Sequence, residues 1–206
     1  MGTKSIEKWQ YGDLQTPIDL SGKVVEVLKW NYGLSPDFVI EPTCGKGAFV
    51  LAAYEGFENS TILGFEINAK YVSEANSSLK RISATNRVVI NQADSFTTDW
   101  EKIFSKSHGY VLIIGNPPWV TSSELGILNS KNLPEKSNFQ NRRGIEAITG
   151  SRNFYISEWM LLQHINWLSK REGAIAFLCK YTVACKNNAT SQTGPKESFF
   201  WTYLFH

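Results

Sequence analysis

Short apolar runs alternate with longer amphipathic segments along most of this chain. Runs rich in β-branched and aromatic residues predict strands at 38–41, 61–66, 87–94, 109–115 and 173–181. Apolar residues at helical spacing, or apolar segments of helical length, predict helices at 17–31, 48–56, 69–81 and 156–171. The segment 120–153 breaks the alternation, because it holds few large apolar residues and many Ser, Asn and Gly. We expect a long loop or insertion there.

Strands that alternate with helices predict an α/β protein with a Rossmann-like, doubly wound and mainly parallel sheet. Such sheets bind ligands at the carboxyl ends of their strands. Polar residues stand at or just past the ends of four successive predicted strands, namely Glu41, Glu66, Asp94 and Asn116. One polar residue at a strand end is ordinary turn chemistry, whereas four in succession indicate a site.

The segment EPTCGKGAF, residues 41–49, has the pattern of a strand end, a glycine turn and a helix start. Gly45 and Gly47 allow close approach of the backbone to a ligand, although a lone G-x-G also occurs in tight turns without function. A dinucleotide fingerprint needs a third glycine, and Val50 occupies that position. Glu41 would repel a pyrophosphate, but it would attract the ammonium group of an amino-acid ligand.

The next two strand ends suggest a nucleoside. Glu66 is placed to accept hydrogen bonds from ribose hydroxyls, or it is simply a favourable charge at a helix N-terminus. Asp94 is placed to accept from an adenine amino group while Phe96 covers the ring; an Asx turn with a core phenylalanine is the alternative. A nucleoside with an amino-acid tail is the common requirement. S-adenosylmethionine fits it, and a nicotinamide dinucleotide fits worse.

The segment Asn116-Pro117-Pro118-Trp119 follows a buried strand. An aromatic exocyclic amine is a poor nucleophile, so methyl transfer to it requires two acceptors that grip its N–H bonds. The Asn116 side-chain oxygen is one acceptor, and a backbone carbonyl held by proline, whose φ is fixed, is the other. Trp119 offers a face on which a base stacks, worth about 1–3 kcal/mol.

These motifs in this order, EPTCGKGAF, GFE, ADSF and GNPPW, resemble those of the amino-group DNA methyltransferases of restriction–modification systems. YGDLQTP, residues 11–17, resembles the motif that precedes the glycine loop in the gamma-type order, and GAIAFLCKY resembles a later motif. The resemblance implies adenine N6 as the target, with cytosine N4 left open. Glu41 stands where Asp or Asn is common in the family.

Carried over by position, the resemblance implies S-adenosyl-L-methionine as cofactor. Thr16, Glu41 and the Gly45–Gly47 backbone would hold its methionine end, Glu66 its ribose, and Asp94 with Phe96 its adenine. Asn116 and the Pro117 carbonyl would grip the target amine, with Trp119 on the base. The full set of cofactor-binding candidates is Thr16, Glu41, Pro42, Cys44, Gly45, Gly47, Phe49, Glu66, Ile67, Asp94, Ser95 and Phe96. Cys44 is assigned no nucleophilic role; we expect its side chain to pack.

The resemblance implies a partner, DNA, whose adenine must be flipped from the duplex. We expect a catalytic domain at 1–186, an unassigned tail at 187–206 and no target-recognition domain, which favours a truncated chain over a shifted frame or an edge strand. Basic residues in 131–152 outnumber acidic ones by five to two, so this loop either contacts phosphate or is simply solvated. The DNA-contact candidates are Lys131, Lys136, Arg142, Arg143 and Arg152.

Length, charge and cysteine content exclude few classes of protein. The 206 residues suffice for one domain, and the net charge of +2 neither requires nor excludes nucleic acid. Three cysteines without metal-ligand spacing favour a reducing cytoplasm, and no membrane segment or metal site is predicted. A methyltransferase for protein glutamine or RNA, an inactive donor-binding fragment and, more distantly, a dinucleotide oxidoreductase are the alternatives. Trp119 and the insertion favour the DNA group over the first.

Overall fold

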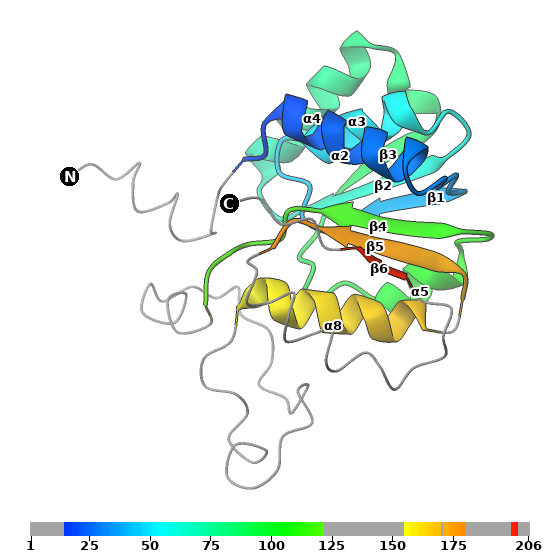
Figure 1. Ribbon diagram of the computed structural model, residues 1–206. Helices are drawn as coiled ribbons and strands as arrows, with labels where there is room; N and C mark the ends of the chain where they lie inside the picture. The colour runs from blue at the N-terminus through cyan, green and yellow to red at the C-terminus, as the bar shows by residue number, and fades with distance from the viewer. Residues whose placement is uncertain (1–14, 122–154, 170, 180–198, 202–206) are drawn as a thin grey trace, which may run out of the picture.

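The computed structural model describes residues 15–121, 155–169, 171–179 and 199–201. Within these residues the chain forms one six-stranded sheet in the order β3-β2-β1-β4-β5-β6, and all its strand pairs are parallel (Figure 1). The strands are β1 (Phe38–Glu41), β2 (Thr61–Glu66), β3 (Val88–Gln92), β4 (Val111–Gly115), β5 (Gly173–Phe177) and β6 (Phe199–Trp201).

Helices lie on both faces of this sheet (Figure 1). The apolar residues of α2, α3 and α4 pack on one face, and those of α5 and α8 pack on the other. In the part of the chain that the structure describes, the helices are α2 (Ile18–Trp30), α3 (Ala48–Gly56), α4 (Ala69–Arg81), α5 (Trp100–Ser105) and α8 (Ile156–Leu168), together with the 3-10 turn η1 (Ala84–Asn86).

Alternation along the central strands builds a core on each face. On β4, Leu112 and Ile114 join the core under α2 and α3, whereas Val111 and Ile113 join the core under α8. Both sets are fully buried, so the strand reads as one continuous apolar run instead of an alternating one. The second core is rich in aromatic rings, including Trp100, which stacks on Trp167 with centroids 5.6 Å apart.

The strand order reverses between β1 and β4, which are hydrogen-bonded neighbours. After β1 the chain crosses to β2 on one side of this point, and after β4 it crosses to β5 on the other side. The loops that follow β1 and β4 therefore diverge and leave a crevice between them. A doubly wound sheet binds its ligand in the crevice at such a point. The fold therefore places the glycine loop and the Asn-Pro-Pro-Trp segment side by side.

The predicted doubly wound parallel sheet is confirmed, with all five predicted strands and all four predicted helices. Trp159 is buried in the second core, and the partly buried Trp167 packs against it. Among the elements in the described residues, three short ones were not predicted: α5, η1 and β6. β6 lies in the 187–206 tail and pairs with β5 at the sheet edge, which is the edge-strand alternative for that tail.

Candidate functional site

The glycine loop connects β1 to α3 in a strained path that suits glycine. Gly45 and Gly47 have φ values of +52° and +86°, in the left-handed region. A Cβ on Gly45 would stand 2.7 Å from the Gln15 side-chain oxygen, and one on Gly47 would stand 3.2 Å from the Ala75 Cβ. The two glycines are therefore needed for the loop's backbone and for its close packing.

Glu66, at the end of β2, connects the glycine loop to the turn that precedes α4. Its Oε2 accepts a hydrogen bond from the Gly45 amide at 2.8 Å, and its Oε1 accepts one from the Asn68 amide at 2.7 Å. Asn68 in turn caps α4 by accepting from the Lys70 amide at 3.0 Å. Ile67 lies between them, half-buried. Glu66 is thus fixed at the mouth of the loop, where the sequence placed a ribose acceptor.

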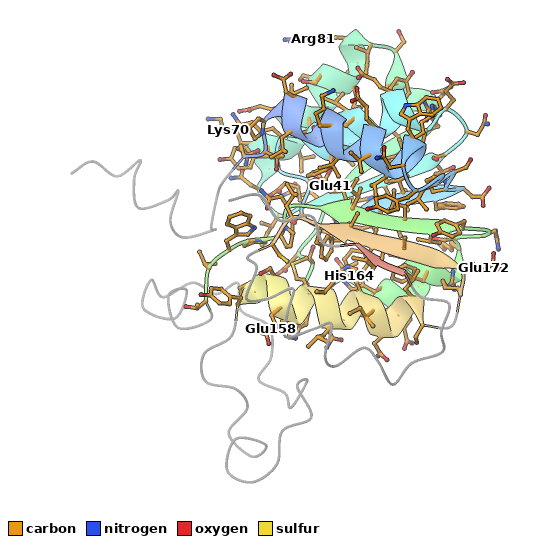
Figure 2. All side chains as sticks on the ribbon, viewed as in Figure 1. Glu41, Lys70, Arg81, Glu158, His164 and Glu172 are labelled. Carbon is orange, nitrogen blue, oxygen red and sulfur yellow. The ribbon has the colours of Figure 1, made fainter. Side chains whose placement is uncertain are left out.

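Glu41 stands one strand away in a very different environment (Figure 2). Its side chain is 3% exposed, and no described group hydrogen bonds to its Oε2. Burial raises the pKa of Glu41 well above its ordinary value. A backbone hydrogen bond at Val50 opposes this shift in part, and the nearby charge of Glu66 adds a smaller upward contribution. A buried acceptor of this kind favours a positively charged donor.

The loops after β1 and β3 are joined through Ser95. Its hydroxyl donates to the carbonyl of Pro42, and the indole N–H of Trp100 donates to the Ser95 carbonyl at 2.9 Å. Pro42 and Ser95 are both buried. These two cofactor-binding candidates therefore fix the relative position of two ligand-facing loops.

Asp94 and Phe96 form the turn that follows β3. The Asp94 Oδ1 accepts from the Phe96 amide at 2.8 Å, and its carbonyl accepts from the Thr98 amide at 2.9 Å. The Phe96 ring packs edge-on against Trp159 with centroids 5.2 Å apart. This is the Asx turn with a packed phenylalanine that was the alternative reading. The turn orients Asp94 and does not conflict with an adenine site.

Two cofactor-binding candidates direct their side chains into the core. Phe49 is fully buried under α2 and α3, so it can serve a ligand only through its backbone. Cys44 is 4% exposed in the same core, and burial followed by the charges of Glu41 and Glu66 raises the pKa of its thiol. Cys44 therefore packs, as expected, while its amide donates to the Phe65 carbonyl at 2.8 Å.

Asn116 follows β4 and is oriented by a residue from before α2. Its Nδ2 donates to the Thr16 hydroxyl at 3.2 Å. Its Oδ1 is buried, and within the described part of the chain nothing donates to it. Pro117 is buried and Pro118 half-buried. The segment presents an amide oxygen whose hydrogen-bonding capacity is not satisfied by the protein.

Trp119 is held by its indole nitrogen. Its Nε1–H donates to the Leu178 carbonyl at 3.2 Å, and the Leu178 amide donates to the Gly115 carbonyl at 2.9 Å. The ring is half-buried against the first core. A ring fixed in this way can act as a stacking surface without losing further rotamer freedom.

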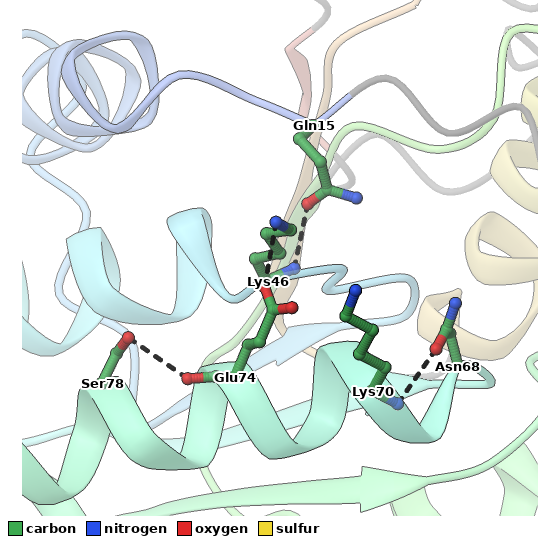
Figure 3. Close-up of polar contacts among 6 residues, drawn as sticks. All are labelled: Gln15, Lys46, Asn68, Lys70, Glu74 and Ser78. Carbon is green, nitrogen blue, oxygen red and sulfur yellow. Dashed lines mark hydrogen bonds and ion pairs between the residues drawn. The ribbon is translucent and has the colours of Figure 1, made fainter. Parts of the chain in front are cut away.

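Gln15 was not identified from the sequence, yet it contacts the glycine loop directly. Its Oε1 accepts from the Lys46 amide at 3.0 Å, and the Lys46 ammonium pairs with Glu74 of α4 at 2.9 Å (Figure 3). Gln15 is adjacent to the motif residue Thr16, which is the one sequence signal that could have pointed to it.

Some predictions fall outside the described residues or concern absences. The DNA-contact candidates Lys131, Lys136, Arg142, Arg143 and Arg152 lie in 122–154, which the structure does not describe. Within the described ranges, no group of three metal-ligating side chains comes together. Nor does any described helix have the length and apolar character that crossing a membrane requires.

A doubly wound parallel sheet with acidic residues at its strand ends is typical of Rossmann-like nucleotide-binding proteins. The chain belongs to the N-6 DNA methylase family, whose model matches residues 4–193. It is 44% identical over 181 residues to the type II methyltransferase M.NspV of Nostoc sp., covering 87% of this chain and 37% of that protein. It is 32% identical over 115 residues to the type II methyltransferase M.CvrRI of Paramecium bursaria Chlorella virus XZ-6E, covering 56% of this chain and 26% of the relative.

The chain thus spans little more than a third of the first of these relatives and about a quarter of the second. Among solved structures it is similar to an RNA methyltransferase from Salinibacter ruber in complex with S-adenosyl-L-homocysteine, with 20% identity, a TM-score of 0.39 and coverage of 50% of this chain and 62% of that one. A geranyl diphosphate methyltransferase in complex with SAM gives 14% identity, a TM-score of 0.40 and coverage of 58% and 46%. Because both TM-scores are low, the fold is assigned from the strand order alone.

Proposed function

We propose that this chain carries the donor-binding and catalytic part of a DNA methyltransferase that transfers a methyl group from S-adenosylmethionine to N6 of adenine. The observation that carries the proposal is the buried Asn116 Oδ1, which no described group satisfies, at the end of β4. An unsatisfied buried acceptor is costly, and a ligand that donates an N–H removes that cost. Membership of the N-6 DNA methylase family supports adenine as that ligand.

The donor would occupy the crevice along β1, β2 and β3. Its ammonium would pair with Glu41, which is buried and has an Oε2 without a described partner. Its ribose hydroxyls would donate to Glu66, and its adenine would lie near Asp94 and Phe96. This assignment uses the three acidic strand ends in the order in which the sheet places them, and no described cluster of metal ligands competes with it.

Catalysis would depend on alignment more than on acid–base chemistry. Asn116 Oδ1 and the Pro117 carbonyl would accept the two N–H bonds of the target amine, so that its lone pair points at the sulfonium methyl group. The new C–N bond would form as the C–S bond breaks. The amine then loses one proton to solvent, and the donor leaves as the neutral thioether.

The DNA partner and the setting of the reaction complete the proposal. We infer that the target adenine is flipped from a duplex onto Trp119, with the basic loop 131–152 near phosphate and residues 1–186 as the catalytic domain. Target recognition would come from a separate or additional region, within a cytoplasmic restriction–modification system. The alternative substrate, a protein glutamine, rests on a weaker relative: the release factor glutamine methyltransferase of Fusobacterium nucleatum is 24% identical over 119 residues.

A product assay tests this proposal. Unmethylated bacterial DNA is incubated with the chain and methyl-labelled donor, then digested to nucleosides and separated. We expect label in N6-methyl-2′-deoxyadenosine, and less than one hundredth of it with Asn116→Ala. Label in N4-methyl-2′-deoxycytidine would change the target base. A parallel reaction offers a glutamine-containing peptide, and label in that peptide but not in DNA would overturn the proposal.

A further inference from the structure

We propose that Thr16 is a positioning residue that fixes which end of the Asn116 carboxamide faces the target amine. This inference deepens the proposed function and rests on it for its catalytic consequence. The Asn116 Nδ2 donates to the Thr16 hydroxyl at 3.2 Å across 100 residues of sequence. Asn116 Oδ1 then takes the other position of the carboxamide, and this oxygen is buried at the end of β4.

The orientation matters because the two ends of a carboxamide have nearly the same shape and opposite hydrogen-bonding character. With Oδ1 toward the target, the side chain accepts an amine N–H. After a half-turn, the NH2 group would face the amine and oppose it, donor against donor. No described residue donates to Oδ1, and the Thr16 contact is the one described side-chain bond of the carboxamide. A hydroxyl can accept or donate, so this contact selects the observed orientation once the hydroxyl proton is engaged by another acceptor.

Thr16 can serve this purpose because it is anchored on both sides. Pro17, next in sequence, has φ −60° and leads directly into α2, and α2 is tied to α3 by the Ser21 hydroxyl, which donates to the Ala48 carbonyl at 3.1 Å. On the other side, Gln15 accepts from the Lys46 amide of the glycine loop at 3.0 Å (Figure 3). Gln15 and Thr16 therefore connect the glycine loop to Asn116.

The Thr16 hydroxyl has a further capacity that this geometry leaves open to a ligand. A hydroxyl accepts through its lone pairs and donates its single proton. Accepting from Asn116 leaves that proton available for the carboxylate of a bound donor. A bound carboxylate would then hold the hydroxyl in its accepting role toward Asn116, so that a filled donor site also sets the acceptor for the target amine.

The first test needs neither donor nor DNA. The side-chain amide signal of Asn116 is identified in ¹⁵N spectra of the full chain by its loss in Asn116→Asp, and the exchange of its protons with solvent is measured. We expect Thr16→Val, which keeps the shape and removes the acceptor, to speed exchange about tenfold, and Thr16→Ser to restore slow exchange. Equal exchange in the wild-type and Thr16→Val chains would overturn the inference.

The second test uses single-turnover methyl transfer and the symmetry of a carboxylate. Asp at position 116 presents an acceptor oxygen in either orientation, so it needs no positioning. We expect Thr16→Val to slow transfer about tenfold with Asn116 and less than twofold with Asn116→Asp. An equal loss in both backgrounds would show a merely structural role. Absence of donor binding by a folded wild-type chain would count against the proposed function, whereas the exchange experiment would still decide the orientation.

Discussion

Two neighbouring regions of the site differ in how their buried polar groups are satisfied. In the loop wall, formed by Gly45, Glu66 and Asn68, the carboxylate of Glu66 already accepts two backbone amides at 2.8 and 2.7 Å. In the floor of the site, formed by Glu41 and Asn116, each side chain has a buried oxygen without a described partner. The loop wall is therefore held by hydrogen bonds within the protein, whereas the two buried oxygens of the floor have no described donor.

The chemistry of the floor agrees with the ligands proposed for it. Both unsatisfied atoms are acceptors, and both proposed ligand groups, an ammonium and an aromatic amine, are nitrogen donors. Glu41 and Asn116 follow adjacent parallel strands, and a Cβ on Gly115 would meet the Glu41 Cγ at 3.5 Å. The difference between wall and floor suggests that the wall fixes geometry and the floor selects ligands, and substitutions can test each part separately.

The largest effect is expected at Asn116. Asn116→Ala removes one of the two acceptors that align the amine, so transfer should fall about 10²–10³-fold, as for other single hydrogen-bonding groups that act at a reacting centre. The donor dissociation constant should change less than twofold, because the alanine leaves the loop wall intact. Single-turnover transfer and calorimetry measure the two quantities. A matching loss of donor affinity would erase the distinction between floor and wall.

The next effect is expected in the wall. Glu66→Ala leaves the amides of Gly45 and Asn68 without their acceptor, and hydrogen bonds to a charged group contribute about 1.5–3 kcal/mol each. We expect the free energy of unfolding to fall by about 3 kcal/mol and donor affinity to fall at least tenfold. Urea denaturation and calorimetry provide the measurements. Glu66→Gln, which keeps one acceptor, is the matched control and should lose about half as much stability.

A buried, unsatisfied atom outside the site provides a contrast with the floor. His164 is a residue of α8, and its ring packs among Trp100, Trp167 and Phe177 (Figure 2). Its Nδ1 is 2.6 Å from the Met160 carbonyl, and its Nε2 has no described partner. Burial lowers the pKa of His164 to about 4. Between about pH 6.5 and pH 4, His164 therefore binds a proton in the unfolded chain but not in the folded chain.

Stability should consequently be lost as the pH falls from about 6.5 to about 4, by about 3 kcal/mol in total. His164→Phe removes this titration and keeps an aromatic ring in the cluster, so its unfolding curve should lack that component of the acid loss. Denaturation at pH 7 and pH 4.5 for both chains measures it. If the two chains lost stability equally, His164 would not carry the effect.

The smallest effect, and the one with two opposite signs, is expected at Glu41. Its pKa is raised in the folded chain, so its contribution to stability is present at low pH and is lost as the pH rises through that folded pKa. Glu41→Gln should therefore be more stable than the wild type at pH 8. The same change removes the charge that pairs with an ammonium, so donor affinity should fall about tenfold. Thermal unfolding and calorimetry at pH 8 test both signs.

Features of the fold and site that depend on local sequence could be predicted, whereas those that depend on contacts between distant residues could not. The runs FVIE and TILGFE are apolar enough to fix β1 and β2 at their observed ends, and polar residues at strand ends point to the site. Asn116 and Glu66 lie within sequence motifs, so the sequence identifies them directly. Packing is less accessible: Phe49 belongs to the cofactor motif, yet α3 is so uniformly apolar that its side chain enters the core.

The missed features depend on tertiary contacts that leave little local pattern. The Gln15 contact with Lys46 joins residues 31 apart, and the Ser95 contact with Pro42 joins residues 53 apart. The burial of Glu41 follows from strand order, which no window of sequence contains. α5 and β6 are short, at six and three residues, and the length of a periodic pattern is what makes an element predictable.

Calorimetric titration of S-adenosylmethionine tests most directly whether the wall binds the donor without help from the floor's amide. The folded wild-type chain, Asn116→Ala, Asp94→Ala and Asp94→Asn are compared; Asp94→Asn keeps the Oδ1 that accepts from the Phe96 amide and thus preserves the turn. We predict equal binding by the wild type and Asn116→Ala, and weaker binding by both Asp94 variants, whose carboxylate is gone. A folded wild-type chain that binds no donor would contradict the account.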